Sequence, residues 1–200
     1  MWGWAGGDPD FSSSPHARLK SIGMNDAAWT GGFWAERIRL SREVTVPGIW
    51  QTMQLRGNGA YFGNLRIAAG LETGEFKGNN WSDGDVAKWL ESAALLYGAT
   101  RDKELDRRMD EVIAVFVKAQ APDGYISTQI QLPRKERWAQ PRDHEVYNMT
   151  HLMSAAVAHH GATGKTSLLD AARRTADYLY KLFSPRPASL AHFGAPSNVM

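Results

Sequence analysis

Apolar residues recur at helical intervals through most of the chain, and they predict four long helices. Over residues 82–99 they occupy so much of the helical circumference that this helix is expected to be largely buried. The next helix starts after Asp102 and has one apolar face, formed by Leu105, Met109, Val112, Ile113 and Phe116. Two further helices are predicted over residues 145–160 and 166–183.

The pattern repeats itself after 63 residues. Gly98-Ala99-Thr100 recurs as Gly161-Ala162-Thr163, and the apolar face of the second helix maps onto Leu168, Ala172, Thr175, Ala176 and Leu179. A repeat of this length, made of helix, tight turn and helix, indicates stacked or ring-closed helical hairpins. We therefore expect an all-α fold, a partial toroid of antiparallel helical hairpins whose long loops are free to carry chemistry.

Shorter helices and glycine-rich loops are predicted before the first hairpin. Residues 33–44 have helical spacing, Pro47 ends or restarts that helix, and a short second helix is predicted over 48–55. Glycines and asparagines make residues 56–81 mostly loop, with one helical piece around 65–71.

Turn and cap signals mark the helix ends. Asp83 and Asp85 are N-cap candidates for the first long helix, and Asp102 is predicted to cap the next one. Pro122-Asp123-Gly124 predicts a tight turn, because proline presets φ and glycine accepts a positive φ. Residues 125–141 are expected to form a long polar connection, in which the alternation at 126–130 fits a short strand.

The two ends of the chain give further expectations. Residues 1–28 are expected to be a poorly ordered lead-in before a domain over residues 29–200. Pro185 and Pro187 close the second hairpin, and residues 190–200 begin another connection. Because two hairpins leave one apolar flank without a partner, we expect the chain to be a fragment of a longer reading frame.

Composition removes several function classes. A net charge of +2 gives no field that favours nucleic acid, and no apolar run approaches the ~20 residues of a membrane span. The start of the chain lacks the pattern of a signal peptide, so the compartment stays open. The chain has no cysteine, which excludes disulfides and thiolate metal sites within these residues.

Eight tryptophans make a high aromatic content for a chain of this size. Trp34 and Trp89 lie inside helical patterns and are expected in the core. Trp81 and Trp138 lie in predicted loops, where core packing and stacking on a sugar ring both remain open.

Histidines and aspartates supply the candidate chemistry. His144 lies at the start of a helix, where a neutral imidazole can both donate to and accept from sugar hydroxyls; capping or packing is its alternative role. His144 and His151 are two turns apart, ~10 Å, too far to share a metal ion directly. His159 and His160 point about 100° apart and are expected to flank the core and the turn, so no metal ligand is predicted.

Carboxylate pairs are the other hallmark of sugar hydrolysis. A glycosidase needs two carboxyl groups roughly 5 Å apart for retention of configuration, or about 6.5–9.5 Å apart for inversion. A helical ring could gather Asp83, Asp85 and Asp123 on one face, although capping explains Asp83 and Asp85 equally well.

Six short motifs in a fixed order resemble the N-terminal half of the catalytic domain of glycoside hydrolase family 127, the β-L-arabinofuranosidase family. They are residues 74–78 (GEFKG), 82–91 (SDGDVAKWLE), 119–125 (AQAPDGY), 144–151 (HEVYNMTH), 162–165 (ATGK) and 176–178 (ADY). The resemblance covers residues 29–200 and implies an (α/α)6 toroid that hydrolyses terminal β-L-arabinofuranosyl linkages with retention.

The resemblance also implies which residues act. In this family a zinc-bound cysteine is the nucleophile and a glutamate is the acid/base, and all of these lie beyond the residues present. We therefore expect no catalytic residue and no metal or cofactor site in this chain, with zinc held only by the missing part and the chain alone inactive. His144 matches the family histidine that contacts the arabinose ring, and Glu145 and Tyr147 complete its motif.

Four residues are predicted to bind a carbohydrate: His144, Trp50, Tyr147 and Asp85. Trp50 ends the segment Pro47-Gly48-Ile49-Trp50, where the family has a glutamine that this chain lacks. Nucleic acid and membranes are not expected as partners. Two alternatives stay open: another sugar-acting α/α toroid of the unsaturated glucuronyl hydrolase or epimerase type, and a non-catalytic helical-repeat scaffold, against which the long aromatic loops argue.

Overall fold

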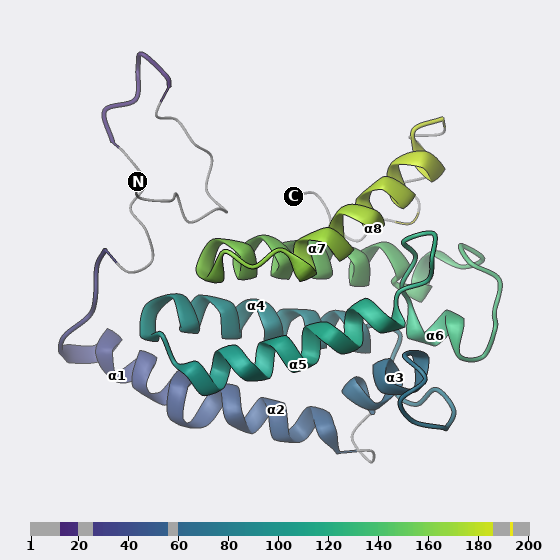
Figure 1. Cartoon of the computed structure of the whole chain (residues 1–200), viewed down its shortest axis with the longest axis horizontal. Coiled ribbons are helices and arrows are strands. Elements are labelled where there is room, and N and C mark those ends of the chain that lie inside the picture. Colours follow the sequence, from purple (N-terminus) through teal and green to yellow (C-terminus); the bar gives the residue numbers. More distant parts are fainter. Residues whose placement is uncertain (1–12, 20–25, 56–59, 186–192, 194–200) are drawn as a thin grey trace.

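All elements in the described part of the chain are helical, as the hydrophobic pattern predicts (Figure 1). The computed structural model describes residues 13–19, 26–55, 60–185 and 193. Most of the predicted lead-in, the loop at 56–59 and the connection over 190–200 therefore lie outside the described residues, apart from residue 193. Within the described part, no helix is both long enough and apolar enough to span a membrane.

The elements follow one another with few long connections. They are α1 (Gly32–Leu40), the π-helical turn η1 (Ser41–Thr45), α2 (Val46–Gln54), α3 (Tyr61–Ala68), α4 (Ser82–Thr100), α5 (Lys103–Ala119), α6 (Thr128–Gln131), the 3₁₀ turn η3 (Pro141–Asp143), α7 (Glu145–Thr163) and α8 (Ser167–Phe183). Pro47 stands in the first turn of α2, directly after the π-helical turn η1, and Thr45 and Val46 before it both keep helical dihedral angles. The helical path therefore runs on past it instead of ending there.

The predicted repeat is visible in the helix boundaries. Ser82–Thr100 and Glu145–Thr163 are both 19 residues long and are offset by 63 residues at both ends. Their partners α5 and α8 are both 17 residues long. The residue after α4 and the residue after α7 both have a left-handed backbone, Arg101 at φ 55° and Gly164 at φ 75°. Both hairpins therefore turn in the same way.

The two hairpins pack with like helices together. α4 lies most extensively against α7, with their N-termini at the same end of the molecule, and α5 packs against α4 and α8 (Figure 1). α2 and α3 cover α4 from the other side. This central position explains why α4 is apolar around most of its circumference, whereas α5 has a single apolar face.

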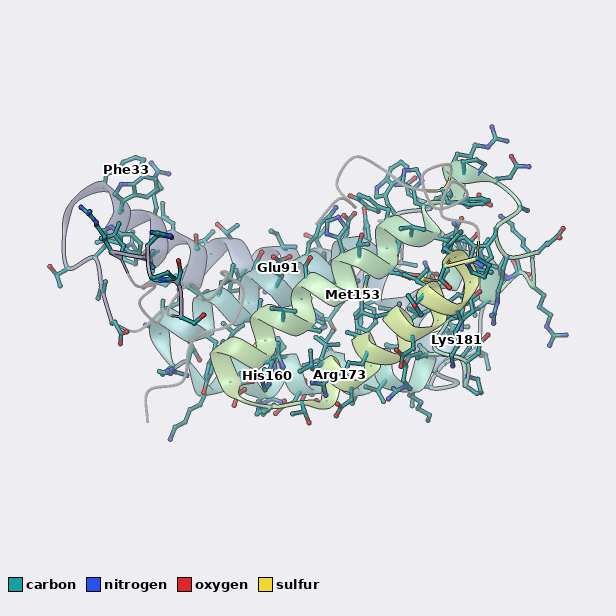
Figure 2. All side chains as sticks on the ribbon, turned by 90° about the horizontal axis from the view of Figure 1, so that it is seen from above. Phe33, Glu91, Met153, His160, Arg173 and Lys181 are labelled. Atoms are coloured by element: carbon teal, nitrogen blue, oxygen red, sulfur yellow. The ribbon has the colours of Figure 1, made fainter. Side chains whose placement is uncertain are left out.

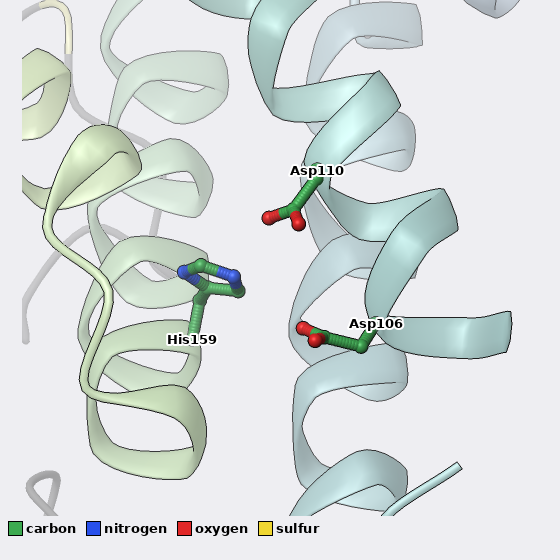
Figure 3. Close-up of side chains that lie close together, drawn as sticks. All are labelled: Asp106, Asp110 and His159. Atoms are coloured by element: carbon green, nitrogen blue, oxygen red, sulfur yellow. The ribbon is translucent and has the colours of Figure 1, made fainter. Parts of the chain in front are cut away.

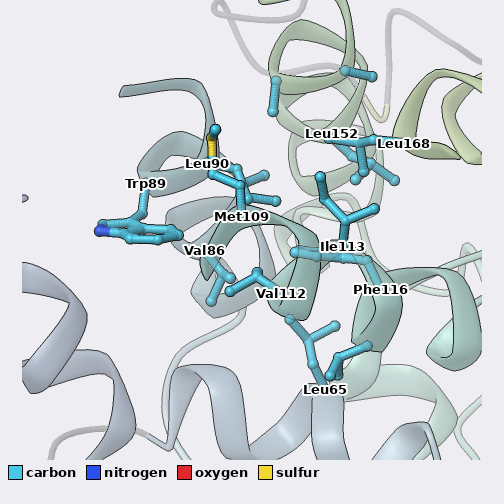
Figure 4. Packing of buried hydrophobic residues seen from close by; sticks show 14 of the residues in the cluster. Leu65, Val86, Trp89, Leu90, Met109, Val112, Ile113, Phe116, Leu152 and Leu168 are labelled. Atoms are coloured by element: carbon cyan, nitrogen blue, oxygen red, sulfur yellow. The ribbon is translucent and has the colours of Figure 1, made fainter. Parts of the chain in front are cut away.

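The core forms where these helices meet (Figure 4). Met109, Val112, Ile113 and Phe116 of α5 are buried against Leu90 of α4, as their spacing predicts. Burying a side chain of this size stabilises the fold by about 1.5–3 kcal/mol. The mapped face of α8 is buried at Leu168, Ala172 and Thr175, while Ala176 is exposed.

The two helical tryptophans differ. Trp89 is 3% exposed and its indole donates to the Val46 carbonyl at 3.0 Å, which confirms a core position. Trp34 is 60% exposed, so the core prediction for it is wrong in this chain. α1 extends beyond the long helices, and Phe33 beside Trp34 lies at the outer edge of the molecule (Figure 2).

Residues 125–130 correct two predictions. All six are buried and end in α6, so the segment is neither a polar surface loop nor a strand. The alternation misled because both polar and apolar side chains here face the protein interior. The predicted turn before them is confirmed: Gly124 has φ +93°, and a Cβ on it would lie 2.2 Å from the backbone oxygen of Arg174.

Of the predicted helix caps, one is confirmed and the other is wrong. The Asp102 carboxylate accepts from the backbone N–H groups of Glu104 and Leu105, which confirms it as an N-cap. α4 has no side-chain cap, so the cap prediction for Asp83 and Asp85 is wrong. Asp83 bonds to a distant loop instead, as described below.

Candidate functional site

The candidate site lies where the N-termini of α4 and α7 meet. His144 is the N-cap residue of α7 and has a left-handed backbone, φ 57° and ψ 26°. Its imidazole Nδ1 is 2.6 Å from the Arg142 carbonyl oxygen. Because a carbonyl only accepts, Nδ1 donates, and in the neutral ring Nε2 carries the lone pair. Among the described residues nothing bonds to Nε2, so it is available as an acceptor.

Two aromatic rings flank this imidazole. Trp81 lies edge-on at 5.6 Å between ring centroids, and Tyr147 at 5.5 Å. Trp81 is 40% exposed and can present an indole face to a ligand beside His144. Trp138, the other loop tryptophan, packs between Tyr178 and Phe183, and its indole donates to the Tyr178 hydroxyl at 2.8 Å. Its place is structural.

A charged group adjoins the rings. The Lys88 ammonium donates to the Asp85 carboxylate at 3.0 Å and makes a short hydrogen bond to the Tyr147 hydroxyl. Burial opposes its charge, but the bonds to Tyr147 and Asp85 outweigh burial and raise the pKa of Lys88. His151 packs edge-on against Tyr147 at 4.5 Å, and burial together with Lys88 lowers its pKa. The site thus holds a lysine ammonium next to a histidine whose surroundings favour the neutral ring.

Asn148 fastens the two helix ends together. Its side-chain oxygen accepts from the Gly84 N–H at 2.9 Å, and its amide donates to the Asn80 carbonyl at 2.7 Å. Asn80 in turn donates to the Arg142 carbonyl at 3.2 Å, the same oxygen that His144 bonds. α4 and α7 approach so closely here that a Cβ added to Gly84 would lie only 2.7 Å from the Asn148 side-chain oxygen.

Two buried carboxylates hold the surrounding loops. Asp83 accepts from the Thr128 N–H at 2.6 Å and from its hydroxyl at 2.7 Å, and burial raises the pKa of Asp83 to about 6. Glu145 accepts from the Trp138 N–H at 2.7 Å and from the Tyr125 hydroxyl, and burial also raises its pKa. Both carboxyl groups are therefore engaged in bonds that hold the fold.

A cavity of about 580 Å³ opens beside the charged group, lined by Asp85, Lys88 and Tyr61 together with residues of α2. Its volume falls in the range of small-molecule sites. His144 does not line it, but the chain His144–Tyr147–Lys88–Asp85 connects the imidazole to its wall. The structure therefore brings three of the four predicted site residues together.

Trp50, the fourth, is elsewhere. It is 6% exposed and packs against Trp89 and Phe62, with ring centroids 4.7 and 5.0 Å apart. This is a core position, and Trp50 lies outside the candidate site. The sequence left sugar stacking open for Trp81, but it did not single out Lys88 or Asn148. The three-residue spacing of Asp85 and Lys88 on a helix was the signal available for Lys88.

Comparisons with known proteins identify relatives of this chain. A sequence profile of the β-L-arabinofuranosidase GH127 catalytic domain matches residues 26–195. A non-reducing end β-L-arabinofuranosidase of Bifidobacterium longum subsp. longum is 33% identical over an alignment of 184 positions that covers 80% of this chain and 28% of that protein.

Solved structures agree. The GH127 β-L-arabinofuranosidase of Geobacillus stearothermophilus T6 matches with a TM-score of 0.74 and 38% identity, over 77% of this chain and 25% of that one. A second GH127 β-arabinofuranosidase matches with a TM-score of 0.71 and 31% identity, over 80% and 26%. The chain therefore spans about a quarter of the length of these relatives. On the profile match over residues 26–195, this chain belongs to the GH127 β-L-arabinofuranosidase family.

Proposed function

We propose that this chain forms part of the sugar pocket of a glycoside hydrolase that acts on terminal β-L-arabinofuranosyl linkages. The main support is the state of His144: a backbone carbonyl fixes its Nδ1, no described residue bonds to its Nε2, and the partly exposed indole of Trp81 lies beside the ring. Family membership supplies the substrate class, because the relatives are named as arabinofuranosidases.

The residues of this chain would act by orientation. His144 Nε2 accepts a hydrogen bond from a sugar hydroxyl, and Trp81 covers an apolar face of the ring. Asp85 accepts from a second hydroxyl at the cavity wall, and Tyr147 is a positioning residue that holds Lys88 and His144 in place. Fixing the sugar in this way lowers the entropic cost of reaching the reactive geometry.

The zinc that the family resemblance implies does not fit this chain. That site uses cysteine thiolates, and the sequence has no cysteine. No step of the function proposed here runs through zinc. We propose that the nucleophile, the acid/base and that metal belong to the part of the toroid beyond these residues, and that this chain alone does not turn over substrate.

The test uses the protein encoded by the whole reading frame that contains these residues, assayed with an aryl β-L-arabinofuranoside. His144→Ala is expected to lower kcat/KM by about 100-fold or more, since a positioned hydrogen bond to the substrate is lost. His16→Ala, which removes an exposed imidazole, is the matched control. Equal activity of the two variants would reject the role of His144. Cleavage of unsaturated glucuronides in place of arabinofuranosides would favour the alternative enzyme class.

A further inference from the structure

A second cluster of ligand-type side chains lies at the opposite end of α7. Asp106 and Asp110 are one turn apart on α5, and His159 faces them from the last turns of α7 (Figure 3). One ligand atom of each lies within 4.8 Å of the others. His159 is 15 positions after His144, about 22 Å along the helix, so this cluster is separate from the sugar site.

The His159 ring is the unusual member. It is 0% exposed, and neither Nδ1 nor Nε2 has a hydrogen-bond partner. Buried polar atoms in proteins almost always have a partner, so an imidazole buried with both nitrogens free requires an explanation. Figure 3 shows the ring directed across the gap toward the two carboxylates of α5.

The carboxylates already hold a cation. The Lys165 ammonium lies 2.7 Å from the Asp106 carboxylate and 2.7 Å from that of Asp110. A primary ammonium donates and cannot accept, so it satisfies the carboxylates, but His159 receives nothing from it. The single ammonium offsets one of the two carboxylate charges, and the imidazole has no hydrogen-bond partner.

We propose that Asp106, Asp110 and His159 bind a divalent transition-metal ion of the Zn²⁺ class, and that Lys165 takes the place of the ion when no metal is bound. One imidazole and two carboxylates are a donor set that suits Zn²⁺ and disfavours Mg²⁺, which prefers oxygen ligands alone. Donors at tetrahedral Zn²⁺ are about 3.4 Å apart, so the site closes by side-chain rotation within the observed spacing.

The site would act as a clamp. It joins α5 of the first hairpin to α7 of the second, at the end of the helices away from His144. Burial and the charge of Lys165 lower the pKa of His159, a shift that favours the neutral ring. The inference does not depend on the proposed function, because it concerns residues outside the sugar site.

The experiment is isothermal titration of the metal-free chain with Zn²⁺, repeated with Co²⁺ to read ligand geometry from its visible absorption. The natural chain is expected to bind one ion saturably. Asp110→Asn and His159→Gln are expected to weaken binding at least tenfold, and Asp110 is half exposed, so its substitution leaves the fold intact. Lys165→Gln is expected to tighten binding at least tenfold, because the competing cation is gone.

The controls are His16→Gln and Asp177→Asn, which remove exposed groups of the same kinds and are expected to bind as the natural chain does. Circular dichroism of every variant confirms the helical content. Absence of saturable binding by the natural chain would overturn the proposal, even if Lys165→Gln binds, since Lys165 would then be the permanent cation. Binding that survives both Asp110→Asn and His159→Gln would also overturn it.

Discussion

The two ends of the α4–α7 layer solve the problem of buried polar groups in different ways. Around His144, Asn148 and Glu145 each bond to more than one segment, although Nε2 of the nearby His151 has no partner. Around His159, one flexible lysine holds two carboxylates, and the imidazole has no partner. The first end is preorganised for a ligand that must be held in one orientation. The second is adjustable, because its carboxylates are held by one lysine side chain that can rotate away.

The largest expected effect on the free energy of unfolding comes from Gly124, the glycine just before the segment that bonds to Asp83 and Glu145. Gly124→Ala places a Cβ 2.2 Å from the Arg174 oxygen at a positive φ, and backbone cannot retreat as a side chain can. We expect a loss of about 3 kcal/mol or more in the free energy of unfolding, measured by urea denaturation. Gly164→Ala is the control for positive φ alone, since its Cβ would meet nothing within 4 Å. Equal losses in both variants would contradict the clash.

The second effect is a pH dependence that belongs to the same end. Folding raises the pKa of Asp83 from an ordinary 3.8 to about 6, so the folded chain favours the protonated form. Its contribution is fully present below pH 3.8 and is lost as pH rises through 6, a change on the order of 3 kcal/mol. Asp83→Asn keeps an acceptor for the Thr128 N–H and can donate to the Thr128 hydroxyl, and it should flatten this part of the stability profile measured by thermal unfolding.

The exposed Asp177 provides the comparison for that profile. Asp177→Asn is expected to leave the natural slope between pH 4 and 6 unchanged. Glu145 has a raised pKa as well and contributes a slope of the same sign, so a residual dependence in Asp83→Asn is expected. A profile identical to that of the natural chain would show that Asp83 is not the titrating group.

A smaller loss of stability is expected from Asn148→Ala, and it should be confined to one end of the helices. Asn148→Ala removes the hydrogen bonds to Gly84 and Asn80 and leaves a buried N–H unpaired, at a cost of about 1–3 kcal/mol. Hydrogen exchange should quicken at the N-terminal turns of α4 and α7 and stay unchanged near His159. Uniform acceleration along both helices would mean that the two ends are not independent.

The smallest expected effect on stability comes from Trp81→Ala, within about 0.5 kcal/mol, because the indole is half exposed. The same change should weaken binding of an arabinofuranoside several-fold, since the sugar loses its stacking surface. Trp34→Ala is the matched control, an exposed indole remote from the site. If the two variants bind the sugar equally well, Trp81 does not contact it.

The sequence predicts the parts of this structure that depend on local rules. Helical periodicity and the repeat place all four long helices within three residues of their ends, and Asp102 caps as its type suggests. His144, Tyr147 and Asp85 come from motif order. Local rules fail where a partner lies far along the chain: Asp83 bonds to Thr128, 45 positions away, and Lys88 to Tyr147, 59 positions away.

The other errors share a cause. Trp34 has the spacing of a core residue, but exposure depends on whether another helix covers α1. Residues 126–130 alternate like a strand, but burial on both sides removes the meaning of alternation. In each case the neighbouring element determines whether a side chain is buried, and the sequence of one segment does not show which element packs against it.

The equal length and common register of α4 and α7 have a consequence for how such a protein can change. Since both helices begin and end at matching positions, their first turns form one end of the molecule together with the segments that precede them. Residues 133–136 of the segment before α7 are exposed, whereas residues 125–130 of the same segment are buried. An insertion in the exposed stretch would therefore enlarge the surface without changing the length or register of the helices.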